Sequence, residues 1–201
     1  MSEIRKERTR DLYIDITCDL IRNDGMSAVT IRAISERAGY NSATMYSYFD
    51  NLSHLIFFAY IRFEDELLEK FKAEVNKEKA SSLYDIWPRM YVIMARFYLE
   101  NPNIFDCLFM SDFAQKDKFD VKSKRAEKSS FNRYVMEKLQ QIAVETGKNM
   151  TLIKRINSIC LAEITGTVLL IVKRRQSPDE LHLAAMEDDL RKLIKCFTEE
   201  S

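Results

Sequence analysis

Glycine and proline are scarce in this 201-residue chain, which has four glycines and three prolines. Few positions therefore force the backbone to turn sharply. Charged and apolar residues alternate at intervals of three and four, which is the period of an amphipathic helix. The sequence predicts an all-α protein.

Clusters of metal-binding and catalytic residues are also missing. The only histidines, His54 and His182, do not follow a glutamate at the Glu-x-x-His spacing of a di-iron bundle. The four cysteines lie far apart and form no CxxC pair, so neither a zinc site nor a disulfide framework is indicated. No glycine-rich phosphate loop or nucleophile elbow is present. We expect no catalytic residues, no metal and no cofactor, and therefore no enzyme.

The chain lacks a long uninterrupted apolar run. The most apolar stretch, residues 159–172, contains Glu163 and is shorter than the roughly 20 residues of a membrane span. The N-terminal residues are charged where a signal peptide would be apolar. We expect a soluble, cytoplasmic protein with no membrane partner.

What the chain does have is a series of amphipathic segments separated by capping residues. The first is expected at residues 4–23, with Leu12, Ile16, Leu20 and Ile21 on its buried face. The segments that follow are expected at about 30–38, 42–49, 52–78, 81–100, 102–113, 119–146, 150–175 and 178–197. Asn101 and Ser177 are expected to cap two of them, each followed by proline.

Two of these segments are short and are hinged at Gly39. Thr30 and Asn41 are suitable N-caps for them, and glycine allows the left-handed turn between them. Packed on the first helix, they would form a helix-turn-helix, whose second helix lies in the major groove of DNA. Spacing alone leaves an ordinary turn between two helices open.

The second short segment carries small and hydroxyl side chains, which permit close approach to bases and donate hydrogen bonds to phosphates. Met45 and Phe49 would face the core. The predicted DNA-binding residues are Thr30, Arg32, Asn41, Ser42, Ala43, Thr44, Tyr46, Ser47 and Tyr48.

Residues 12–55 carry a specific family signature. Gly25, Thr30-Ile31, Ile34, Ala38-Gly39 and Thr44-Met45-Tyr46-x-Tyr48-Phe49 resemble, in order and spacing, the N-terminal signature of the TetR/AcrR family of bacterial transcriptional regulators. The resemblance implies a homodimer, a DNA-binding domain at residues 1–50, and a helical ligand-binding and dimerisation domain at residues 51–201.

The chain departs from the family pattern at several positions. Asn41, Ala43 and Tyr40 stand where the family commonly has serine, glycine and a small aliphatic residue. Residues 50–53 read Asp-Asn-Leu-Ser where the family often has Lys-Ser-Lys-Glu, with a lysine that reaches a phosphate. Residues 1–50 hold seven basic and eight acidic side chains, so we expect few phosphate neutralisations and a shallow salt dependence of DNA binding.

Aromatic and methionine side chains concentrate between residues 87 and 113. They suit either a tightly packed core or an adaptable apolar pocket. With the family resemblance, the predicted pocket residues for a small hydrophobic or aromatic ligand are Trp87, Met90, Tyr91, Met94, Phe97, Phe105, Phe109, Phe113 and Glu163. Glu163 has apolar neighbours, so it is either paired, at an exposed edge or in contact with a ligand.

Residues 150–175 and the last helix offer apolar faces that suit a four-helix dimer interface. Ala162 and Gly166 would allow close approach of a partner helix. The sequence therefore predicts a sequence-specific transcriptional regulator, a repressor that a small hydrophobic ligand releases from a roughly palindromic operator. The alternative is a ligand-independent architectural or nucleoid-associated DNA-binding protein.

Overall fold

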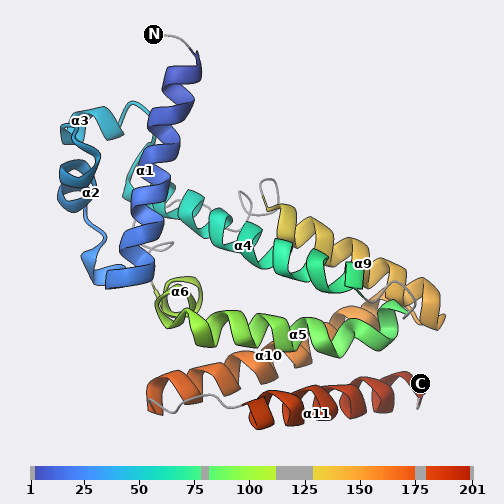
Figure 1. Cartoon of the computed structure of the whole chain (residues 1–201). Helices are drawn as coiled ribbons and strands as arrows, with labels where there is room; N and C mark the ends of the chain where they lie inside the picture. Colours follow the sequence, from blue (N-terminus) through green and yellow to red (C-terminus); the bar gives the residue numbers. More distant parts are fainter. Residues whose placement is uncertain (1–2, 78–81, 112–128, 175–179, 200–201) are drawn as a thin grey trace. The chain divides into compact units, whose positions relative to one another are not determined.

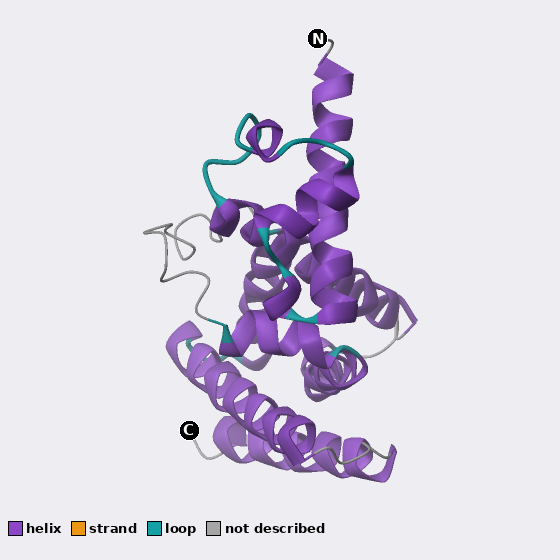
Figure 2. Ribbon diagram, turned by 90° about the vertical axis from the view of Figure 1, so that its left-hand side faces the viewer, coloured by secondary structure: helices purple, strands orange, loops and turns teal. Residues whose placement is uncertain are grey.

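The computed structural model describes residues 3–77, 82–111, 129–174 and 180–199. Every regular element within these ranges is helical, which confirms the all-α prediction (Figures 1 and 2). Phe113, the first part of the helix expected at residues 119–146, and the predicted cap at Ser177 lie outside the described residues. The elements are α1 (Glu3–Asp24), η1 (Met26–Ala28), α2 (Ile31–Ala38), α3 (Ser42–Met45), α4 (Leu52–Lys77), α5 (Leu83–Glu100), α6 (Pro102–Phe105), η2 (Asp106–Met110), α9 (Ser130–Thr146), α10 (Met150–Arg174) and α11 (Glu180–Glu199).

The chain divides into two compact units. The first unit comprises Met1–Glu66 and Asn101–Ser129, and the second comprises Leu67–Glu100 and Ser130–Ser201. The division falls within α4, and the domain boundary after residue 50 stays a prediction. The one continuous helix α4 therefore contributes residues to both units.

The first unit is built on α1, which packs against α2 and α6. The buried residues of α1 are Tyr13, Ile14, Thr17, Leu20 and Ile21. The prediction that Leu12 faces the core was wrong, because Leu12 is 39% exposed. The buried stripe instead follows the helical spacing from residue 13, which places Leu12 at its solvent edge.

Arg22 joins three elements of the first unit. Its guanidinium bonds both carboxylate oxygens of Glu66 on α4 at 2.7 Å, and it donates to Oδ1 of Asn101 at 2.7 Å. Asn103 of α6 donates to the backbone carbonyl of Arg22 at 3.0 Å. The expected side-chain cap at Asn101 is absent, because its Oδ1 bonds Arg22 instead of a backbone amide of α6.

In the second unit, α5 packs against α9, α10 and α11 (Figure 1). Two consecutive hydrogen bonds link α5 to α10. Trp87 Nε1 donates to the Tyr91 hydroxyl at 2.8 Å, and that hydroxyl donates to Oδ1 of Asn157 on α10 at 2.7 Å. Tyr84 and Thr198 also join their hydroxyls at 2.6 Å. These bonds fix the register of α5 on its neighbours.

Helix α10 is less covered than its composition suggests. Among the described residues, it is the helix that is long and apolar enough to cross a membrane by length and composition, and 28% of its most apolar window is buried. The sequence had led us to expect no such helix. Leu170 is 52% exposed, and Ala162 and Glu163 are also exposed. The chain therefore presents an uncovered, mostly apolar strip along α10.

Candidate nucleic-acid interface

The turn between α2 and α3 has the predicted capping geometry. The Thr30 side chain accepts a hydrogen bond from the Ala33 amide at 3.1 Å, and Asn41 Oδ1 accepts from the Thr44 amide and the Thr44 hydroxyl, both at 3.0 Å. Gly39 ends α2 in the left-handed region, with φ 69°. Residues that carry a side chain rarely adopt this backbone conformation, so glycine suits the point where the chain reverses.

The α-helical part of the second short segment is only Ser42–Met45. Its continuation is a turn in which the Ser47 amide donates to the Thr44 carbonyl at 3.1 Å and the Phe49 amide donates to the Met45 carbonyl at 3.0 Å. Met45 and Phe49 are buried, as predicted. The segment is shorter as a regular helix than we expected, because the chain tightens to bring Phe49 into the core.

The predicted DNA-binding residues of this segment are more exposed than Met45 and Phe49. Tyr46 is 53% exposed, while Thr44 and Tyr48 are half-buried. The remaining predicted DNA-binding residues are all exposed: Thr30, Arg32, Asn41, Ser42, Ala43 and Ser47. We call this exposed, mostly polar set the polar face.

A cluster of aromatic rings, which we call the tyrosine cluster, supports this face from inside. It consists of Tyr13, Tyr40, Tyr48 and Phe49. The Tyr13 ring centroid lies 6.1 Å from that of Tyr40, 6.1 Å from that of Tyr48 and 6.3 Å from that of Phe49. Sequence reasoning missed Tyr13, although its spacing from Thr17 and Leu20 could have placed it on the buried stripe.

The start of α4 is arranged differently from the family pattern. Asn51 caps the helix by accepting from the His54 amide at 2.8 Å, and His54 Nδ1 accepts from the Asp50 amide at 3.2 Å. The Arg10 guanidinium of α1 lies 4.1 Å from the centroid of Phe58. A cation from α1 is thus held beside the first turns of α4, where the family's lysine is missing.

Most arginines of the first unit already have carboxylate partners. Arg22 pairs with Glu66 at 2.7 Å, Arg32 with Glu36 at 2.7 Å, and Arg37 with Asp24 at 2.9 Å. In the described part of the chain, Arg5, Lys6 and Arg8 are exposed and form no such pair. Among the described basic residues of the first unit, these three side chains at the start of α1 are the most available to phosphates.

The predicted pocket residues fall in both compact units. Five of them lie buried along α5 in the second unit: Trp87, Met90, Tyr91, Met94 and Phe97. Phe105 and Phe109 belong to the first unit, where Phe105 is buried and Phe109 is 42% exposed. Glu163 lies on the exposed side of α10. The pocket remains a prediction.

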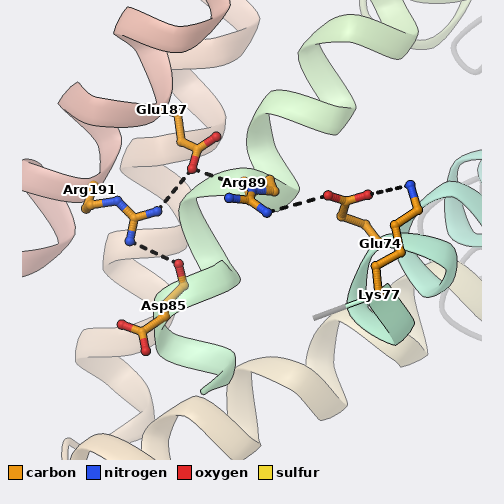
Figure 3. A network of polar contacts seen from close by, with 6 residues as sticks. All are labelled: Glu74, Lys77, Asp85, Arg89, Glu187 and Arg191. Carbon is orange, nitrogen blue, oxygen red and sulfur yellow. Dashed lines mark hydrogen bonds and ion pairs between the residues drawn. The ribbon is translucent and has the colours of Figure 1, made fainter. Parts of the chain in front are cut away.

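The second unit also has a charged groove of about 590 Å³ between α4, α5 and α11, with Phe97 among its lining residues. Arg89 lies between two carboxylates, 3.6 Å from Glu74 and 3.6 Å from Glu187 (Figure 3). Lys77 pairs with Glu74 at 3.1 Å, and Arg191 pairs with Glu187 at 3.0 Å (Figure 3). The charges lining this end of the groove are therefore largely compensated by each other.

The described residues contain no group of three or more histidine, cysteine or acidic side chains placed to hold a metal ion. Burial raises the pKa of the Cys18, Cys107 and Cys160 thiols to about 12 in each case. A thiol with such a pKa is protonated at neutral pH, so none of the three is a ready nucleophile.

Comparison with known proteins identifies the N-terminal region. Residues 14–57 match the family model described as bacterial regulatory proteins, tetR family. No curated protein matches the chain. The family resemblance read from the sequence is therefore confirmed.

Solved structures with the same fold cover nearly the whole chain. A TetR family transcription regulator from Marinobacter aquaeolei VT8 has 15% identity and a TM-score of 0.65, covering 96% of this chain and 98% of its own. A TetR transcriptional regulator from Rhodococcus sp. RHA1 has 17% identity and a TM-score of 0.56, covering 96% and 97%. At these identities the likeness establishes the fold.

Proposed function

Because the chain carries the N-terminal domain of the tetR family of regulators and shares the fold of TetR-family transcription regulators, we propose that it is a dimeric, cytoplasmic repressor. It binds a roughly palindromic operator and leaves it when a small hydrophobic ligand binds. The observation that carries this proposal is the capped α2–turn–α3 unit. It places an exposed polar face over a buried Met45 and Phe49.

The polar face has the chemistry of DNA readout. Hydroxyls such as that of Tyr46 donate to phosphates, which fixes the protein on the duplex without sequence preference. Small residues at the start of α3, such as Ser42 and Thr44, permit contact with base edges in the major groove. We assign phosphate binding to Tyr46 and base reading to Ser42 and Thr44.

Dimerisation is supported by the uncovered strip on α10. A Cβ added at Gly166 would meet no atom within 4 Å, so a neighbouring helix could approach the backbone at this position. Exposed Leu170 and Ala162 extend the strip on either side. Pairing α10 and α11 with their copies would bury this strip in a four-helix interface.

The dimer is tested by analytical ultracentrifugation at micromolar concentration. We expect a dimer for the wild type and a monomer for Leu170→Glu, because the introduced carboxylate would be buried in the interface. The matched control is Val144→Glu on α9, where Val144 is 75% exposed, and it should remain a dimer. A monomeric wild type would contradict the proposed α10–α11 dimer interface. Binding of the protein to detergent micelles through α10 would instead favour contact of this helix with a membrane.

The ligand site is proposed along α5, where Trp87, Met90, Tyr91 and Met94 are buried together. Methionine and aromatic side chains repack around apolar ligands of different shapes. Helix α4 belongs to both units, so a shift of its second half would be transmitted along one continuous helix. The ligand would favour the protein state that fits the operator less well.

The experiment that tests the function is selection of genomic DNA fragments by the purified protein, repeated with a panel of hydrophobic compounds. A selected fragment that one compound releases would support a ligand-responsive repressor. The same compound should raise the melting temperature of the protein, because it binds the native state. Selective binding that no compound alters would favour the ligand-independent architectural alternative.

A further inference from the structure

The interior of the first unit holds a hydroxyl that has no partner. Tyr13 on α1 is completely buried, and its hydroxyl has no hydrogen-bond partner among the described residues. The other such buried side-chain atom in the described chain is Ser35 Oγ on α2. Buried polar groups are normally paired, so an orphaned hydroxyl in a core indicates a use beyond packing.

The surroundings of Tyr13 show where this use lies. Its ring contacts Tyr40, which precedes α3, and Tyr48, which follows it. Tyr40 is 45% exposed and Tyr48 is half-buried, so both residues are partly accessible to solvent. Burial raises the pKa of the Tyr13 phenol, and the neighbouring Tyr40 and Tyr48 phenols raise it further.

We propose that Tyr13 is a positioning residue for DNA binding. When the operator is bound, the Tyr13 hydroxyl donates to the phenol oxygen of Tyr40 or Tyr48, and that phenol donates its own proton to a phosphate. This proposal rests on the proposed DNA-binding function and adds a second layer to it. A chain of two hydrogen bonds is cooperative, because each bond polarises the next.

The proposal gives the Tyr13 hydroxyl a role that a phenylalanine at this position would lack. In the free protein an unpaired buried hydroxyl is destabilising, so Tyr13→Phe should stabilise the free protein and raise its melting temperature by about 2–4 °C. In the complex the same substitution removes one hydrogen bond per protomer. Operator affinity should fall on the order of fivefold per protomer, and on the order of 25-fold for a dimer. If Tyr13 had only a structural role, Tyr13→Phe would not raise the melting temperature and at the same time weaken operator binding.

The experiment measures melting temperature without DNA and operator affinity by fluorescence anisotropy. The variants are Tyr13→Phe, Tyr40→Phe, Tyr48→Phe and the two double variants that contain Tyr13→Phe. We expect the Tyr13 effect to disappear in one of the two double variants, because the acceptor of its hydrogen bond has then been removed. Affinity for an unrelated duplex should fall in parallel, since a phosphate contact carries no sequence information.

Two controls separate this role from general effects of hydroxyl removal. Ser35→Ala removes the other orphaned hydroxyl and should raise the melting temperature without changing DNA affinity. Tyr84→Phe removes a paired hydroxyl in the second unit, and it should lower the melting temperature and also leave affinity unchanged.

Several results would overturn the inference. One is an operator affinity that Tyr13→Phe leaves unchanged. Another is an additive loss of operator affinity in both double variants. A lower melting temperature would show that the hydroxyl is already paired in the free protein. If the wild type binds no duplex at low salt, the proposed function fails as well. Binding by the wild type with no effect of Tyr13→Phe removes this inference alone.

Discussion

The salt dependence of DNA binding should be set by three side chains at the start of α1. Arg5, Lys6 and Arg8 are exposed and have no carboxylate partner in the described chain, whereas Arg22, Arg32 and Arg37 each have one. Three contacts per protomer give about six per dimer, and a slope of log K against log salt of about −5. Affinity should then fall on the order of a thousandfold between about 50 and about 200 mM salt.

Removing one of these cations, as in Lys6→Gln, should make the dimer's slope shallower by about 1.8, because two copies are lost at about 0.9 each. The assay is fluorescence anisotropy on one operator fragment over a salt series. Arg37→Gln is the matched control, since Arg37 already pairs with Asp24 at 2.9 Å, and its slope should not change. A wild-type slope near −9, or an unchanged slope after all three residues are replaced, would refute the assignment.

Further expectations follow from other contacts. Asn41→Ala should lower stability by about 0.5–2 kcal/mol in urea melts, because Asn41 accepts from both the amide and the hydroxyl of Thr44. Arg22→Ala should lower stability by about 1–2 kcal/mol through loss of its bonds to Glu66 and Asn101, while Lys192→Ala, an exposed pair with Asp188, should change nothing measurable. Tyr46→Phe should weaken binding to all duplexes alike, whereas Thr44→Ala should change the preferred sequence; equal losses for both would show that the roles are misassigned. The free energy of unfolding should fall as pH rises from 9.0 toward about 12. In the unfolded chain the Cys107 and Cys160 thiols ionise near pH 9.0, whereas in the folded protein burial keeps them protonated up to about pH 12. Urea melts at increasing pH measure this, and a flat profile would contradict it.

The sequence was sufficient for the elements whose signals are local. Thr30 and Asn41 form the caps that their residue types predicted, and Gly39 takes the left-handed turn. Met45 and Phe49 are buried because their spacing places them opposite the polar residues. These features depend on neighbours within four positions, which sequence patterns describe well.

Features set by tertiary contacts were not predictable. Asn101 was expected to cap a helix, but its oxygen bonds Arg22, which is 79 positions away. Leu20 and Ile21 of α1 are buried as expected, but further toward the N-terminus Tyr13 rather than Leu12 faces the core. Glu163 has apolar neighbours in sequence yet lies on the exposed side of α10. In each case the position of the side chain depends on whether another helix packs against it, which the local sequence does not record.

The central claim is that a dimer of this chain places two α3 segments on one operator. The most direct measurement is a hydroxyl-radical footprint of the best selected genomic fragment with the wild-type protein. We predict a two-fold symmetric protected site whose half-sites are about 34–36 Å apart, which is one turn of the duplex. A single asymmetric protected patch, or no selective protection at low salt, would contradict the account.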